Sequence, residues 1–146
     1  MKFRLLDRIM NCDATRLAAV KAISFEEFDL LAPWGRRGVF PESLILQTAV
    51  EAAGVLLAIQ SGFASFGVLS EIAEARFHRG TEPGDVLRIE VRAEERCGGE
   101  FSFVIAIGDD LLADGRVRLV GLPLESCYGD RDSFRRRLEE LGGQVA

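Results

Sequence analysis

The feature that most constrains the fold of this chain is a long, almost wholly apolar segment, PESLILQTAVEAAGVLLAI, at residues 41–59. Pro41 suits the first position of a helix, and good helix formers follow it. Apolar side chains would lie on almost every face of such a helix, so other structure must enclose it. The sequence therefore predicts a buried central helix over about residues 41–60.

After its first turn, three polar side chains interrupt this segment: Gln47, Thr48 and Glu51. Their positions, i, i+1 and i+4, place them together on one side of the helix, about one turn inside its start. Two interpretations are open. The polar side is either a narrow edge that faces solvent, since buried glutamate is rare unless it is paired, or part of the wall of a ligand cavity.

Strands are predicted on both sides of the central helix. Residues 4–10 and 15–23 form two strands joined by a turn at residues 11–14, where Asn and Asp can bond their own backbone. Residues 32–41 form an irregular loop before the helix. Residues 68–79 form the first strand after it.

The second half of the chain has the pattern of an antiparallel meander. Residues 87–94 alternate strictly between apolar and charged side chains, which predicts a strand with one buried and one wet face. A second strand over residues 101–107 follows the turn at Gly98-Gly99, and a third follows Asp109-Asp110. The whole is an α+β arrangement in which a sheet wraps a buried helix.

A second helix is predicted near the end of the chain, over about residues 130–141. An Asp or Ser caps it, Gly142-Gly143 closes it, and Phe134, Leu138 and Leu141 lie on its inward side. Three successive arginines, residues 135–137, form a solvated face.

Composition limits the classes of function. At 146 residues the chain is one domain, residues 1–146. A net charge of -5 argues against a nucleic-acid binder. The three cysteines form no C-x-x-C pair and the single histidine lies near none of them, so we expect no metal site. Scattered cysteines without a signal peptide favour the cytoplasm. The longest unbroken apolar run, residues 52–59, is shorter than the roughly 18 residues of a membrane span, so no transmembrane segment is expected.

Four segments, in order and spacing, resemble the β-hydroxyacyl-acyl carrier protein dehydratases, a family with the hotdog fold. They are FRLLDRI (residues 3–9), AAVKAISFEE (18–27), VFPESLILQTAVEAAGVLL (39–57) and ARFHRGTEPGDVLRIEV (75–91). The resemblance extends to about Leu122. It implies a hotdog fold, with the last segment as a hairpin of the third and fourth strands.

The resemblance also implies a catalytic pair, which this sequence lacks. In the family a histidine in a Gly-His-Phe-Pro-Gly pattern removes the α-proton, and a carboxylic acid fourteen residues later protonates the departing hydroxyl. Aligned through residues 39–41, the histidine position is Pro33 and the carboxylate position is Gln47. Neither side chain can transfer a proton near neutral pH, so the family reaction should fail.

Other positions follow from the same resemblance. The substrate would lie beside Trp34, Val39, Glu42 and Ser43, with Glu42 replacing a glycine that lets the thioester carbonyl approach the start of the helix. No cofactor is implied. A local basic patch for an acidic carrier protein would comprise Arg36, Arg37, Arg76, His78 and Arg79. The alternative is that these are ordinary charges at strand edges.

Two functions are compatible with these residues. The first is a dehydratase-like protein of fatty-acid or polyketide-type metabolism that binds an acyl thioester of acyl carrier protein or coenzyme A, or pairs with an active subunit. The second is an acyl thioesterase that uses Glu51 as a base or nucleophile. In either case we expect a homodimer, or a heterodimer with a related hotdog subunit, formed by pairing of sheet edges.

Overall fold

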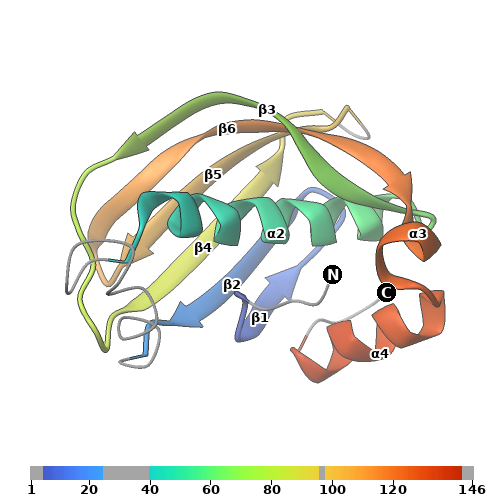
Figure 1. Ribbon diagram of the computed structural model, residues 1–146, viewed down its shortest axis with the longest axis horizontal. Helices are drawn as coiled ribbons and strands as arrows, with labels where there is room; N and C mark the ends of the chain where they lie inside the picture. The colour runs from blue at the N-terminus through green and yellow to red at the C-terminus, as the bar shows by residue number, and fades with distance from the viewer. Residues whose placement is uncertain (1–4, 25–39, 96–97, 143–146) are drawn as a thin grey trace.

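A curved antiparallel sheet wraps one long helix in the computed structural model, which describes residues 5–24, 40–95 and 98–142 (Figure 1). The strands are β1 (Arg8–Cys12), β2 (Arg16–Ala22), β3 (Ser65–Phe77), β4 (Val86–Ala93), β5 (Glu100–Ile107) and β6 (Asp110–Pro123). The helices are α2 (Glu42–Gln60), α3 (Leu124–Tyr128) and α4 (Arg131–Glu140). This is the α+β hotdog arrangement that the sequence predicts.

The order of strands across the sheet is β1-β2-β4-β5-β6-β3, and every neighbouring pair is antiparallel. The predicted meander is β4-β5-β6. The predicted hairpin of the third and fourth strands is wrong, because β3 crosses over to pair with β6 while β4 lies between β2 and β5. The alternation of apolar and polar side chains identifies a strand but does not show which other strand it pairs with.

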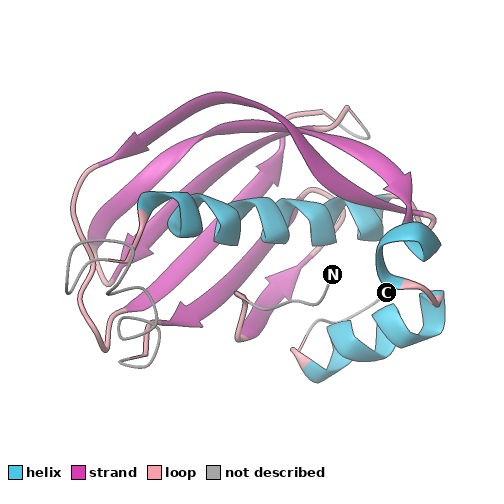
Figure 2. Ribbon diagram, in the orientation of Figure 1, coloured by secondary structure: helices cyan, strands magenta, loops and turns pink. Residues whose placement is uncertain are grey.

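The inner face of the sheet and helix α2, which is buried without interruption over residues 48–56, make the core. On β4 and β5 the buried side chains are those that the alternation predicts: Leu87, Ile89, Val91, Phe101, Phe103 and Ile105. Helix α2 crosses this concave face and packs on β2, β3 and β4 (Figure 2). Burial of this apolar surface, at about 25 cal/mol per Å², is the main force that holds the helix in place.

Helix α2 begins and ends close to the predicted limits. Pro41 is the residue before its first turn, and Ser61 follows its last residue. By length and hydropathy alone this helix could cross a membrane, but 61% of its most apolar window is buried inside the protein. Its apolar surface is therefore occupied by the sheet, as in the core helix of a globular domain.

Helix α2 and β3 approach each other so closely at Gly54 and Gly67 that neither position has room for a side chain. A Cβ at Gly54 would lie 2.7 Å from the ring carbon Cζ of Phe66 and 3.0 Å from the carbonyl oxygen of Gly67. A Cβ at Gly67 would in turn lie 2.5 Å from Leu119. The two glycines thus set the position of α2 over the edge strand β3.

The ends of the chain differ most from the prediction. The first strand is β1 at residues 8–12 rather than 4–10, and the turn that follows it contains Asp13, whose carboxylate accepts a hydrogen bond from the backbone N–H of Thr15 (2.8 Å). Helix α3 was not predicted. Helix α4 forms as expected, with Asp130 as its N-cap residue.

Candidate functional site

A pocket of about 170 Å³ lies between α2 and β3. Its walls are formed by Gln47, Val50 and Glu51 from α2 and by Phe66, Gly67, Val68 and Leu69 from β3. Two of the three polar side chains predicted to share one side of the helix, Gln47 and Glu51, therefore meet in one cavity, opposite the apolar side chains of β3. Such a mixture of apolar walls and few polar groups is typical of a ligand pocket.

Glu51 is the carboxylate of this pocket, and only 6% of its surface is exposed. One of its oxygens, Oε2, accepts a hydrogen bond from the backbone N–H of Leu5, 3.2 Å away. Burial raises the pKa of the Glu51 carboxyl, while this N–H donor and the charge of Lys21 oppose the rise. A carboxyl in such a setting can accept or deliver a proton nearer neutral pH than an exposed one.

Lys21 is a buried cation that the sequence interpretation missed. It lies on β2 with only 3% of its surface exposed, on the same inward face as Leu17 and Ala19. Its Nζ lies 3.4 Å from the carbonyl oxygen of Ala22. The alternation of residues 17–21 is the signal that could have found it, because an inward register puts the lysine beneath the central helix.

Thr48, the third polar residue of the helix, does not join the pocket. It is fully buried, and its hydroxyl donates a hydrogen bond to the carbonyl oxygen of Ile45, one turn earlier (2.6 Å). A threonine satisfied by its own helix needs no external partner. Burial of both Thr48 and Glu51 contradicts the interpretation of this side as a solvent-facing edge.

The start of α2 carries Glu42 and Ser43, and both side chains are exposed. Just before it, the backbone N–H of Phe40 donates to the hydroxyl of Thr81 (3.3 Å), which fixes the entry of the chain into the helix. The other predicted residues of this region, Pro33, Trp34, Arg36, Arg37 and Val39, lie outside the described residues. Their roles remain predictions.

The remaining members of the predicted basic patch come together at the end of β3. His78 Nε2 lies 2.7 Å from Asp114, and Arg76 Nε lies 3.0 Å from the same carboxylate. Arg79 pairs with Asp110 at 2.8 Å. The hydrogen bond from His78, followed by the contacts with Arg76, lowers the pKa of Asp114. Each of these three basic side chains thus faces a carboxylate, so they do not present an excess of positive charge.

No group of three or more His, Cys, Asp or Glu side chains is placed to hold a metal ion within the described parts of the chain. Two side chains of the pocket carry polar groups that could contact a ligand, Gln47 and Glu51. Gln47 can donate and accept hydrogen bonds but cannot exchange a proton, whereas Glu51 can do so.

Comparison with known proteins agrees with the fold. The FabA-like domain family matches residues 1–119. The 3-hydroxyacyl-[acyl-carrier-protein] dehydratase FabZ of Blochmanniella floridana is 31% identical over 118 residues, which cover 77% of this chain and 78% of that protein.

Two solved structures have a similar fold. One is the dehydratase heterocomplex ApeI:P from Xenorhabdus doucetiae (TM-score 0.67, 20% identity, 81% of this chain and 82% of that chain). The other is a hypothetical thioesterase protein with coenzyme A from Streptococcus pneumoniae TIGR4 (TM-score 0.64, 8% identity, 80% and 85%).

Proposed function

We propose, because this chain belongs to the FabA-like domain family, that it binds the acyl group of a thioester in the pocket of Gln47 and Glu51 and does not by itself dehydrate 3-hydroxyacyl thioesters. The single observation that carries this proposal is the side chain of Gln47. It lines the pocket at the position where the resemblance implies a carboxylic acid.

The loss of proton transfer follows from the chemistry of the two positions. Dehydration requires a base for the α-proton and an acid for the departing hydroxyl. Pro33 has no titratable group, and the amide of Gln47 does not ionise near neutral pH. Each general acid or base contributes typically 10²- to 10⁴-fold to the rate. Glutamine at this site keeps the ability to hold a carbonyl or hydroxyl of the ligand by hydrogen bonds.

The thioester would be carried by acyl carrier protein or coenzyme A. Support comes from the FabZ relatives, named for the first of these carriers, and from the Streptococcus pneumoniae protein solved with the second. The proposed setting is fatty-acid or polyketide-type metabolism in the cytoplasm. The burial of α2 inside the sheet is consistent with a protein that needs no membrane.

A second hotdog subunit would complete the site. Strand β3 is the last strand of the sheet, and residues 70–73 in its middle are exposed. An edge strand of 13 residues is a template for pairing with another chain. Pairing there would also cover the pocket, which uses residues 66–69 of the same strand. The partner would be either a second copy or a related active subunit; support for the second comes from the structural neighbour ApeI:P, which is a dehydratase heterocomplex.

The test is a turnover assay on the purified protein with 3-hydroxyacyl and trans-2-enoyl thioesters of both carriers. We expect binding without interconversion, whereas interconversion at a rate above the uncatalysed one that depends on the concentration of the protein would contradict the proposal. Light scattering on the same sample reports the oligomer. A stable monomer of about 16 kDa would contradict the pairing of β3 edges.

The second candidate function, acyl thioester hydrolysis, is favoured by Glu51. This carboxylate is buried, lines the same pocket as Gln47, and has a raised pKa. It could activate water or attack the thioester carbonyl. Glu51→Gln separates the two functions, because glutamine keeps size and hydrogen bonding but removes proton transfer. Hydrolysis by the native protein that the variant loses would support a thioesterase, and equal or absent hydrolysis by both would exclude it.

A further inference from the structure

The ring of Phe66 is part of the pocket wall on the side nearer the C-terminal end of α2. This side chain lines the pocket together with Gln47, Val50 and Glu51, and it also lies against Gly54. Gly54 follows Val50 by one turn of α2, toward the C-terminal end of the helix. An acyl chain that enters beside Gln47 and runs along α2 in this direction therefore meets the ring of Phe66.

Behind Phe66 stands Phe134 of helix α4. The two rings meet edge to face with centroids 6.0 Å apart, and Phe134 makes a second such contact with Phe63 at 5.9 Å. We call Phe63, Phe66 and Phe134 the aromatic cluster. All three are buried, and the guanidinium of Arg135 lies 5.1 Å from the ring centroid of Phe63. Edge-to-face pairs contribute energy beyond that of area burial.

The backbone at Phe63, in the aromatic cluster, has an unfavourable conformation. Phe63 has φ of 66°, in the left-handed region that bulky residues rarely adopt. Such a conformation persists only where surrounding contacts determine it. Here the N–H of Phe63 bonds the carbonyl oxygen of Ala58 (2.8 Å), and its ring packs on Phe134. Helix α4 thus holds a strained turn directly behind the pocket wall.

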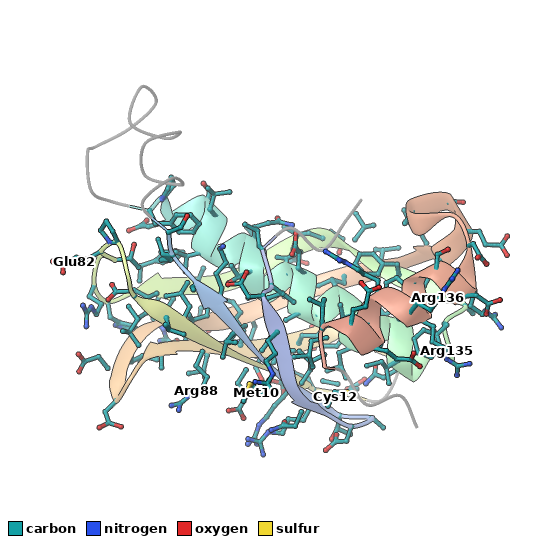
Figure 3. The ribbon with its side chains drawn as sticks, turned by 90° about the horizontal axis from the view of Figure 1, so that it is seen from below. Met10, Cys12, Glu82, Arg88, Arg135 and Arg136 are labelled. Carbon is teal, nitrogen blue, oxygen red and sulfur yellow. The ribbon has the colours of Figure 1, made fainter. Side chains whose placement is uncertain are left out.

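A hydrogen bond outside the helical ladder holds each end of helix α4. Asp130 caps its start by accepting from the N–H of Asp132 (3.1 Å), and the carbonyl oxygen of Leu141 accepts from the N–H of Ile9 on β1 (2.7 Å). Leu138 is fully buried, while Arg135 and Arg136 point outward (Figure 3). The helix lies beyond residue 119, where the match to the FabA-like domain ends. It packs behind Phe66 through Phe134 and so supports this wall of the pocket.

We infer that Phe134 limits the length of the acyl chain that this protein accepts, by fixing Phe66 as the end wall of the pocket. This inference rests on the proposed binding of acyl thioesters. A cavity of about 150 Å³ accommodates a molecule the size of benzene, so a pocket of about 170 Å³ suits an acyl chain of roughly six carbons. Phe134 is a positioning residue, because it acts on the ligand through Phe66.

The experiment measures affinities of the full-length protein for acyl-coenzyme A thioesters of four to twelve carbons by isothermal titration calorimetry. Each methylene buried strengthens binding about fourfold. The native protein should gain affinity up to about six carbons and then stop. In Phe134→Ala, Phe66 can retreat into the vacated space, and we expect the ratio of ten-carbon to six-carbon affinity to rise at least about tenfold.

Two further variants separate this effect from general loosening. Phe134→Leu removes less volume and should shift the ratio in the same direction by a smaller factor. If circular dichroism shows that Phe134→Ala is unfolded, Phe134→Leu takes its place as the test of the chain-length limit. Leu138→Ala is the matched control, since it also removes a fully buried side chain from α4, one turn after Phe134 along the helix. We expect it to leave the chain-length profile unchanged.

The outcomes distinguish this inference from the proposed function. If the native protein binds no acyl thioester of any length, the proposed function fails and the inference fails with it. If the native protein binds but the folded Phe134 variants keep its profile, or Leu138→Ala shifts it equally, only the role of Phe134 is refuted.

Discussion

Substitution of Gly54 by alanine tests the close approach of α2 to β3, on which the pocket depends. In most helices this substitution stabilises, because alanine exceeds glycine in helix propensity by about 1 kcal/mol. Here the new Cβ would lie 2.7 Å from Phe66 Cζ and 3.0 Å from the carbonyl oxygen of Gly67. Phe134 holds the ring of Phe66 in place, and the carbonyl oxygen belongs to the backbone of a paired strand, so neither neighbour can move away freely.

Two opposing free-energy terms decide whether Gly54→Ala stabilises or destabilises the fold. Overpacking of a core typically costs about 1–3 kcal/mol, and the propensity gain of about 1 kcal/mol offsets part of it. Because one contact is shorter than 3.0 Å and another is with backbone, the net loss should lie in the upper part of the remaining range, at about 1–2 kcal/mol. For a domain of this size that lowers Tm by roughly 2–8 °C.

Urea denaturation followed by circular dichroism measures this loss. Ser43→Ala in the exposed first turn of α2 serves as the control, since it makes an alanine in the same helix without a steric conflict. Gly67→Ala should be at least as destabilising as Gly54→Ala, because its Cβ would lie 2.5 Å from Leu119 and no helix propensity offsets the clash. A Gly54→Ala variant more stable than the native protein by about 1 kcal/mol would show propensity alone and refute the close approach.

Three other changes have definite expected outcomes. The Glu51 carboxyl has a raised pKa in the folded protein, so its ionisation destabilises the fold as pH rises above the ordinary value of 4.5. The Tm of Glu51→Gln should therefore increase relative to that of the native protein between pH 4 and 8, and a difference in Tm that stays constant over this range would contradict the burial of Glu51. Asp114 has a lowered pKa, caused first by His78, so its contribution is present above the ordinary value of 3.8 and is lost as pH falls. Asp114→Asn should cost less than about 1 kcal/mol at pH 7, because its partners are exposed, and a larger loss in urea would be inconsistent with that. Asp130→Ala removes the acceptor of the Asp132 N–H and should lower the urea midpoint in the same assay; an unchanged midpoint would mean that the cap is unimportant.

The parts of the fold that could be predicted are those set by local periodicity. The alternation of residues 87–94 identified β4 and its buried face, and the apolar run at residues 41–59 identified α2 and its enclosure. The place of β3 could not be found in this way. It is fixed by long-range pairing with β6 and by the contact of Gly54 with Gly67, residues that carry no periodic signal.

The candidate site could be predicted in part. Helical spacing placed Gln47 and Glu51 on one side of α2, where both line the pocket. The same spacing could not show that Thr48 stays out of the pocket, because its hydroxyl donates a hydrogen bond to the carbonyl oxygen of Ile45 in the same helix. Lys21 was missed although its register on β2 was readable. The aromatic cluster could not be foreseen, since it joins side chains from the turn after α2, from β3 and from α4.

Saturation-transfer NMR on a mixture of the protein and a 3-hydroxyacyl thioester of six carbons tests the central claim most directly, because one sample reports both binding and chemistry. The account predicts that saturation passes from the protein to the acyl methylenes and that no vinyl protons of an enoyl product appear. Glu51→Gln and a sample without protein serve as references. Vinyl signals that grow in proportion to the concentration of the protein, or an acyl chain that receives no saturation, would contradict it.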